Sequence, residues 1–210
     1  MTAENPTAQN TGAGPELDLL TRLDPEQLER LHHRLEQEAA AAGILDLAYN
    51  TTDSPVGTLL LVATDQGLVR VAFASEHHEH VLAGLAETVS PRILRSPVRL
   101  ESAVRQLDEY FAGRRRVFDL PLDRRLSKGF RAEVLQHLPA IPYGRTESYA
   151  QVAAAVGNPK AVRAVGSACA TNPLPVVVPC HRVLRSDGAF GGYLGGPEAK
   201  AYLLGLEAAA

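Results

Sequence analysis

The chain has 210 residues, a formal net charge of −3, 45% hydrophobic residues and 21% charged residues. These proportions are typical of a soluble globular protein of one or two domains. No stretch approaches the roughly 18 consecutive apolar residues of a membrane span. Two cysteines exclude a disulfide scaffold and a four-cysteine zinc site. We therefore expect a cytoplasmic protein that does not contact a membrane.

Charge is distributed unevenly along the chain. Residues 1–123 hold 11 Lys and Arg against 19 Asp and Glu, a net charge of −8, whereas residues 124–210 hold 10 against 5, a net charge of +5. A positive excess in one half of a chain favours contact with a polyanion such as DNA or RNA. Attraction between two domains would produce the same asymmetry, so charge alone leaves both interpretations open.

The first 43 residues differ in character from the rest. Residues 1–14 are rich in Thr, Ala, Asn, Gly and Pro, a composition that predicts a disordered tail. Asp24-Pro25 is typical of a helix start, and this helix is expected to end near Ala42. Residues 15–43 are therefore interpreted as a helical extension without chemistry of its own.

Residues 44–121 predict a small α+β domain with an antiparallel sheet. Runs of β-forming residues separated by turn sequences indicate strands, and apolar residues at helical spacing indicate helices. We expect three antiparallel strands and then two helices, at about Leu45–Thr51, Thr58–Thr64, Leu68–Ala74, His77–Thr88 and Leu100–Ala112. The histidines that begin the first of these helices are more typical of a solvated helix end than of a metal site, and no bound metal is expected.

Residues 122–210 predict a second, mostly helical domain. Ser127 is a candidate N-cap for a helix that runs to about Leu138. Ser148 and Gln151 form a capping box, which predicts the start of a short helix.

This short helix is expected to end at Gly157, and Asn158-Pro159 begins another helix that runs to about Ala170. Two short helices joined by a glycine-containing turn are a helix-turn-helix candidate. One face of the second helix carries a single cation among very small side chains, namely Arg163, Gly166, Ser167 and Ala170. Such a face can lie close against DNA, with the arginine reaching in, but packing against another helix explains the same pattern.

The reactive residues follow a short apolar run. Leu174–Pro179 contains prolines near both ends and predicts a buried extended segment, which leads into Cys180 and His181. A cysteine beside a histidine in a net-positive region is a candidate nucleophile, because these surroundings stabilise its thiolate. The pair is compatible with a cysteine hydrolase, a redox thiol or an irreversible alkyl acceptor. The absence of a Cys-x-x-Cys pattern disfavours a dithiol redox enzyme.

A glycine-rich segment at Gly188–Gly196 predicts a mobile loop that lets the backbone approach a ligand closely. Pro197 begins a final helix, in which we expect Tyr202, Leu203 and Leu206 to face inward. Glu207 lies near the end of this helix, where a surface carboxylate is the simplest interpretation.

Two segments carry a family resemblance. Asn172-Pro173 and Pro179-Cys180-His181-Arg182-Val183 resemble the signature of O6-alkylguanine-DNA alkyltransferases, the methylated-DNA–protein-cysteine methyltransferases. The resemblance covers about Leu122–Glu207 and extends more loosely from about Leu45. It implies direct, irreversible, single-turnover transfer of the alkyl group from O6-alkylguanine in DNA to the cysteine, without a cofactor, and O4-alkylthymine is a further candidate substrate. The implied partner is double-stranded DNA, bound through its minor groove and with base flipping by a protein that we expect to be a monomer.

The resemblance also implies a role for individual residues. The alkyl acceptor corresponds to Cys180, the histidine that takes its proton through a water to His181, and the glutamate that orients that histidine to Glu207. The asparagine that links the recognition helix to the active-site segment corresponds to Asn172. Tyr149 corresponds to the tyrosine that helps to extrude the nucleotide and hydrogen-bonds the base.

Further correspondences concern the DNA and the base. Arg163 matches the arginine that replaces the flipped base, and Val183 and Tyr193 match positions that line the base pocket. Leu194 stands where some members have a serine near the guanine O6, so a backbone N–H would have to make that contact. No cysteine precedes Cys169, so the N-terminal zinc site of some members is not expected.

Two alternative functions remain beside alkyl transfer. A non-catalytic relative would bind alkyl lesions and flag them, although such relatives lack the acceptor cysteine. A cysteine hydrolase would turn over a small substrate and ignore DNA.

Overall fold

The computed structural model describes residues 24–209, and the chain divides into two compact units at Gly43. The first unit contains α2 (Pro25–Ala41), which begins where the sequence predicted, and the Asp24 carboxylate accepts a hydrogen bond from the Glu26 N–H at 3.3 Å. The predicted tail at 1–14 lies outside the described residues. None of the described helices combines the length and apolar composition that a membrane span requires.

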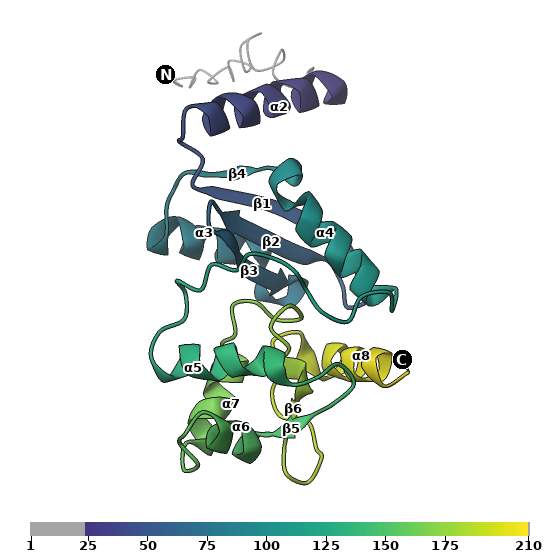
Figure 1. The fold of residues 1–210 in the computed structure, drawn as a ribbon. Coiled ribbons are helices and arrows are strands. Elements are labelled where there is room, and N and C mark those ends of the chain that lie inside the picture. The colour runs from purple at the N-terminus through teal and green to yellow at the C-terminus, as the bar shows by residue number, and fades with distance from the viewer. Residues whose placement is uncertain (1–23, 210) are drawn as a thin grey trace, which may run out of the picture. The chain divides into compact units, whose positions relative to one another are not determined.

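The second unit begins with a mixed sheet of strand order β3-β2-β1-β4 (Figure 1). The antiparallel strands β1 (Leu47–Thr52), β2 (Leu59–Thr64) and β3 (Gly67–Phe73) confirm the three predicted strands. A fourth strand, β4 (Ile93–Arg95), pairs in parallel with β1 and was not predicted, because three residues are too few to show an alternating pattern. The predicted α+β class is confirmed.

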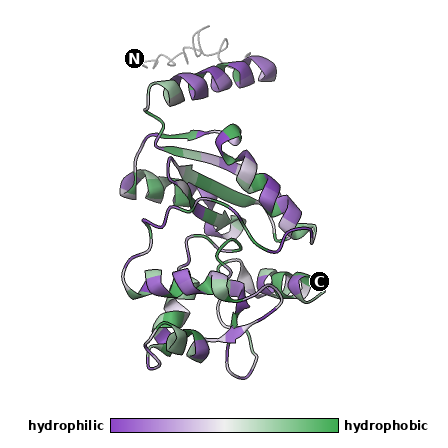
Figure 2. Ribbon diagram, viewed as in Figure 1, coloured by the Kyte–Doolittle hydropathy of each residue, from purple (hydrophilic) through white to green (hydrophobic). Residues whose placement is uncertain are grey.

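Alternate residues of β2 belong to two different hydrophobic cores, because successive side chains of a strand point to opposite faces. Leu60 and Val62 pack with Leu85 of α3 (His78–Thr88) on one face. Leu59 and Leu61 face α4 (Pro97–Phe111) and the helical part of the unit on the other. All six residues of β2 are buried, and Figure 2 shows the strand as strongly hydrophobic.

The helical part is built from four helices and a short parallel strand pair. They are α5 (Phe130–His137), α6 (Tyr149–Ala155), α7 (Val162–Ala170), α8 (Gly196–Ala208), β5 (Glu147–Ser148) and β6 (Val183–Leu184). The predicted capping box is present, since Ser148 Oγ accepts the Gln151 N–H at 3.2 Å and Gln151 Oε1 accepts the Ser148 N–H at 2.7 Å. α6 and α7 pack together as the predicted helix-turn-helix pair, with α5 against both.

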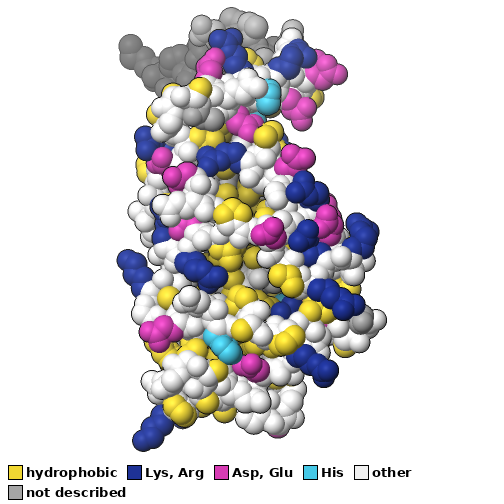
Figure 3. Space-filling view, viewed as in Figure 1, with side chains coloured by type: hydrophobic (Ala, Val, Ile, Leu, Met, Phe, Trp, Pro, Cys, Tyr) yellow, Lys and Arg dark blue, Asp and Glu magenta, His cyan; other side chains and the backbone are white. Residues whose placement is uncertain are grey.

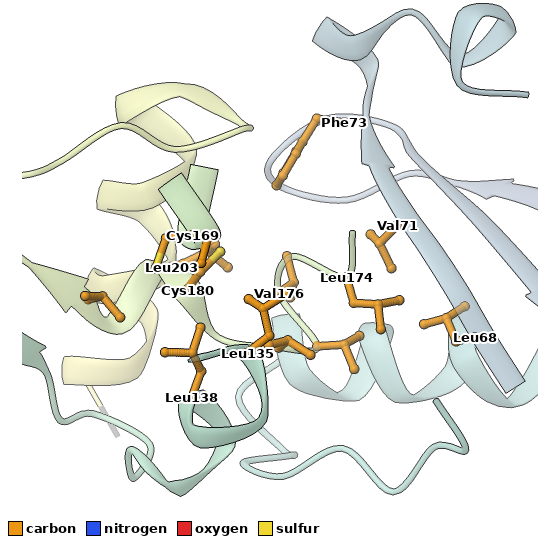
Figure 4. Packing of buried hydrophobic residues seen from close by; sticks show 14 of the residues in the cluster. Leu68, Val71, Phe73, Leu135, Leu138, Cys169, Leu174, Val176, Cys180 and Leu203 are labelled. Atoms are coloured by element: carbon orange, nitrogen blue, oxygen red, sulfur yellow. The ribbon is translucent and has the colours of Figure 1, made fainter. Parts of the chain in front are cut away.

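The sheet and the helical part share one core. Val71 and Phe73 of β3 belong to the same buried cluster as Leu174 and Val176, and Figure 4 shows these side chains close together. The Val71 N–H donates a hydrogen bond to the Pro173 carbonyl at 2.9 Å. Strand β3 therefore supports the segment that leads to the candidate cysteine.

Two predicted helix starts are wrong. Ser127 does not cap α5, because Gly129, with a φ of 57°, turns the chain immediately before the helix begins. α7 begins at Val162 rather than at Pro159, because the intervening residues form a turn closed by the Ala161 N–H and the Asn158 carbonyl at 2.9 Å.

Two predictions about the end of the chain need correction. Leu174–Pro179 is largely buried as predicted, but it forms turns instead of an extended segment. Val176 has a φ of 71°, and the Val178 N–H bonds the Leu174 carbonyl at 2.7 Å. Tyr202, which was expected to face inward, is 40% exposed, whereas Leu203 is buried.

Candidate active site

Cys180 begins a single 3-10 turn, η3 (Cys180–Arg182), and is only 1% exposed. The side-chain N–H of Asn172 donates to the cysteine Sγ at 3.1 Å and to the Val178 carbonyl at 2.9 Å. The side-chain amide oxygen of Asn172, Oδ1, accepts the Leu174 N–H at 3.0 Å. One fully buried amide at the end of α7 therefore fixes both the turn and the sulfur.

The Cys180 sulfur is a thiol at neutral pH, so the expectation that its surroundings stabilise a thiolate is wrong. Burial raises the pKa of Cys180 to about 11, although the Asn172 hydrogen bond and the Lys200 charge act in the opposite direction. A thiol is a much weaker nucleophile than a thiolate. Chemistry at this sulfur therefore needs a base that removes the proton as the reaction proceeds.

His181 and Glu207 form a buried pair next to the cysteine. The His181 Nε2 lies 2.8 Å from Glu207 Oε1, and the two residues are 0% and 3% exposed. Arg182 donates to both carboxylate oxygens, each at 2.9 Å, and the Gly144 N–H donates to Oε2 at 3.1 Å. Burial by itself would raise the pKa of Glu207, but the hydrogen bonds from His181 and Arg182 lower it to about 2. Glu207 is therefore a carboxylate and not the surface residue that the sequence suggested.

This geometry fixes the proton on the imidazole. A carboxylate only accepts hydrogen bonds, so the Nε2 that faces Glu207 carries the proton and Nδ1 carries a lone pair. The His181 Nδ1 is buried and has no hydrogen-bond partner among the described residues. Burial lowers the pKa of His181 against the opposing effect of Glu207, which favours the neutral ring. The site thus contains a neutral histidine with a free basic nitrogen.

Two residues of this site were missed by the sequence analysis. The Tyr110 hydroxyl, from α4, donates to Glu207 Oε1 at 2.7 Å and lies 3.5 Å from His181 Nε2. Lys200, from α8, is fully buried, and its ammonium donates to the Val183 carbonyl at 2.7 Å. Burial lowers the pKa of Lys200. Neither residue belongs to the signature segments, and a contact over such separations in the chain leaves no local pattern.

Tyr149 lies between α7 and the glycine-rich loop. A Cβ atom on Gly191 would overlap the tyrosine hydroxyl, and one on Gly166 of α7 would lie 4.0 Å from the ring. Burial, together with the neighbouring cysteines, raises the pKa of Tyr149 to about 12. Its phenol therefore keeps its proton and can serve as a hydrogen-bond donor.

The residues expected to line a base pocket lie around the same centre. Val183 is fully buried, and the Tyr193 ring lies 6.4 Å from the His181 ring. Tyr193 also contacts Phe73 of β3 edge-on, with ring centroids 5.6 Å apart. Leu194 is half-buried next to Tyr193.

The outer face of α7 agrees with the small-residue pattern. Arg163, Ser167 and Ala170 are exposed and Gly166 is half-exposed. The buried face consists of Val165, Ala168 and Cys169, whereas Ala164 is exposed. The small-residue face is therefore not packed against another helix, and one of the two interpretations of the pattern is removed. Figure 3 shows Lys and Arg side chains on the surface of the helical part.

The described residues contain no cluster of side chains suited to bind a metal ion. Within 24–209 there is no group of three or more His, Cys, Asp or Glu side chains placed to hold a metal ion. The chemistry that the structure positions is that of a buried thiol, a neutral imidazole and an ionised carboxylate.

Comparison with known families agrees with this site. Residues 129–209 match the family model described as "6-O-methylguanine DNA methyltransferase, DNA binding domain", and residues 47–124 match its "ribonuclease-like domain". These two matches cover most of the chain, so the chain belongs to the O6-methylguanine-DNA methyltransferase family. The helix α2 lies outside both matched segments.

Individual relatives are similar over most of their length. A constitutive methylated-DNA–protein-cysteine methyltransferase of Bacillus subtilis is 42% identical over 160 residues, which is 76% of this chain and 94% of that protein. The crystal structure of the Mycobacterium tuberculosis O6-methylguanine methyltransferase has a TM-score of 0.69 at 37% identity, covering 78% of this chain and 93% of that one. The M. tuberculosis OGT structure in complex with DNA has a TM-score of 0.67 at 38% identity, covering 77% and 93%.

Proposed function

We propose that this protein repairs DNA by moving the alkyl group of O6-alkylguanine irreversibly to Cys180. The observation that carries the proposal is a buried cysteine, held by Asn172, beside a His181–Glu207 pair with a free imidazole nitrogen. The family membership supports the same chemistry. The alkylguanine lesion is the main substrate, and O4-alkylthymine is a second candidate.

DNA would be bound through the outer face of α7 by a single copy of the protein. The small exposed residues of that face allow a close approach to the minor groove, and Arg163 is the long side chain among them. The target atom is out of reach inside a duplex, so the base must be flipped at a cost of a few kcal/mol. Arg163 then fills the space in the stack, and Tyr149 holds the base outside it.

Entry of the base requires a local opening. Cys180 is 1% exposed, and the Tyr149 hydroxyl lies against Gly191 in the loop. We infer that Tyr149 and the glycine-rich loop move apart to admit the base. Val183, Tyr193 and Leu194 would then contact it, the last through its backbone.

Every atom and electron of the proposed transfer is accounted for without a cofactor. The Cys180 thiol loses its proton toward His181 Nδ1 through a bridging water, and Glu207 stabilises the imidazolium that forms. Sulfur attacks the alkyl carbon, the S–C bond forms, and the C–O bond breaks with its electrons on guanine. Tyr149 donates a hydrogen bond to the departing base. The thioether product has no route back to a thiol here, so each molecule acts once.

A matched pair of cysteine variants tests this function. In a titration with duplex DNA containing O6-methylguanine, the unchanged protein should repair lesions up to one equivalent and then stop. C180S should repair none while retaining DNA binding, and C169S, which alters the other buried cysteine, should behave like the unchanged protein. Repair beyond one equivalent would indicate a turning-over enzyme, and tight binding without any repair would indicate a lesion-flagging protein.

A further inference from the structure

The helix α4 places a tyrosine inside the catalytic network although it belongs to the sheet part of the unit. The Tyr110 hydroxyl donates to Glu207 Oε1 at 2.7 Å and lies 3.5 Å from His181 Nε2, and the residue is fully buried. We propose that Tyr110 is a positioning residue that sets the orientation and the basicity of His181 through Glu207. The inference rests on the proposed alkyl transfer.

The proposed role of Tyr110 depends on its hydroxyl and not on its ring. The Tyr110 ring packs against Phe111, Phe118 and Tyr143, with centroids 5.4, 5.2 and 6.1 Å away. A phenylalanine would fill the same space and keep these contacts. Removal of the oxygen alone therefore isolates its effect on Glu207 from its effect on packing.

The Glu207 carboxylate has every acceptor position occupied. Oε1 accepts bonds from Tyr110, His181 and Arg182, and Oε2 accepts bonds from Arg182 and Gly144. A carboxylate offers about four lone-pair positions, so these five donors fix its rotation. With the carboxylate fixed, the Nε2–H of His181 can donate in only one direction, toward Oε1 of Glu207. The Nδ1 atom therefore stays free for the proton from Cys180.

The hydrogen bond from the Tyr110 hydroxyl also stabilises part of the negative charge of Glu207. Without it, the carboxylate interacts more strongly with an imidazolium, which raises the pKa of His181. The ionisable and charged groups around this ring are Cys180, Arg182, Tyr193, Lys200, Glu207 and Tyr110. Only the last of these comes from the sheet part, and burial raises the pKa of the Tyr110 hydroxyl so that it remains a donor.

The test is the pH dependence of single-turnover methyl transfer in the full chain. Y110F should slow transfer at neutral pH by roughly tenfold to a hundredfold, which is the range that one hydrogen bond to a charged group corresponds to. The acidic limb of its rate profile should move to higher pH, because more of His181 is protonated, and DNA binding should be unchanged. Y143F is the matched control, since Tyr143 lies in the same aromatic cluster but its hydroxyl donates only to the Leu206 carbonyl, at 3.4 Å.

Several outcomes would overturn the proposal. A Y110F rate and profile equal to those of the unchanged protein would do so, as would a slower rate with an unmoved acidic limb, which indicates a purely structural role. The unchanged protein offers a second measurement that does not depend on the folding of a variant. Nitrogen-15 spectra of labelled histidine should show His181 as the Nε2–H tautomer, and the opposite tautomer would contradict the proposal. Failure of the unchanged protein to transfer methyl at all would instead reject the proposed function.

Discussion

Glu207 joins three side chains of the site through one buried carboxylate. It accepts bonds from His181, Arg182 and Tyr110, and its pKa is held at about 2. A carboxyl whose pKa falls on folding stabilises the folded state above its ordinary pKa, and this contribution is lost as the pH falls toward the folded value. Glu207 should therefore contribute on the order of 3 kcal/mol at neutral pH.

E207Q should lower the free energy of unfolding by about this amount at neutral pH, because it removes the ionised carboxylate and leaves Arg182 buried without its partner. The difference from the unchanged protein should shrink as the pH falls from about 4.5 to about 2. Urea denaturation across this pH range measures it. E198Q is the control, since Glu198 is exposed on the same helix, and its effect should be small throughout. An E207Q deficit that does not change with pH would contradict the account.

The sequence predicted part of this residue network. The signature segments identified Cys180, His181 and Asn172, and the family resemblance added Glu207 at the far end of α8. Residue patterning alone suggested a surface role for Glu207, because its contacts come from elements distant in the chain. Tyr110 left no signal for the same reason, since it lies 97 residues from the carboxylate that it contacts.

Strand β3 holds the segment that directly follows α7 in place. Arg70 donates to the Pro173 carbonyl at 3.3 Å and pairs with Glu76, and both of these charged side chains are mostly buried. Pro173 directly follows Asn172, which bonds the acceptor sulfur. The strand therefore contributes to the position of Cys180 without touching it.

R70M should reduce the free energy of unfolding by about 2 kcal/mol, because it leaves the Glu76 carboxylate unpaired in a mostly buried position. It should also slow methyl transfer several-fold without weakening DNA binding. R92M is the control, since Arg92 pairs with Asp46 on the surface, where an ion pair contributes about 0–1 kcal/mol. Equal effects of the two variants on stability and transfer would reject this role of β3.

Gly144 joins the turn before β5 to α8. It has a φ of 72°, and a Cβ there would lie 2.9 Å from the Glu207 carbonyl oxygen. G144A should therefore destabilise the protein by more than the roughly 1–2 kcal/mol that a left-handed conformation costs a non-glycine residue. G113A is the control and should lose only the roughly 1–2 kcal/mol of the left-handed conformation, because Gly113 has a φ of 71° with open space around it. Thermal unfolding of both variants gives the difference, and equal losses would contradict the close packing at Gly144.

Strong local sequence patterns predicted the positions of most helices and strands. Backbone conformations that depart from these patterns left no signal in the sequence. The alternation of β2 and the capping box of α6 were sufficient to predict both elements. The turns at Leu174–Pro179 depend on a positive φ at Val176, a conformation that β-branched residues rarely adopt. No rule based on sequence would place it there, because the surrounding core imposes it.

Across the whole molecule, the charge asymmetry and the exposed face of α7 both agree with the proposed mode of DNA binding. Arg163 is the long side chain of that face, and its proposed task is to fill the stack of a duplex. R163A should therefore reduce transfer from a duplex about tenfold, and much less from a single strand, which has no stack to repair. R105A, on the exposed side of α4, should change neither rate. An equal loss of R163A on both substrates would reduce Arg163 to a general phosphate contact.

Intact-protein mass spectrometry, followed by peptide mapping, tests directly whether Cys180 accepts the alkyl group. After incubation with a duplex that contains O6-methylguanine, each molecule should gain one methylene unit, located on Cys180 and persistent after the DNA is removed. An unchanged mass, or a methyl group on any other residue, would contradict the assignment of this sulfur as the acceptor.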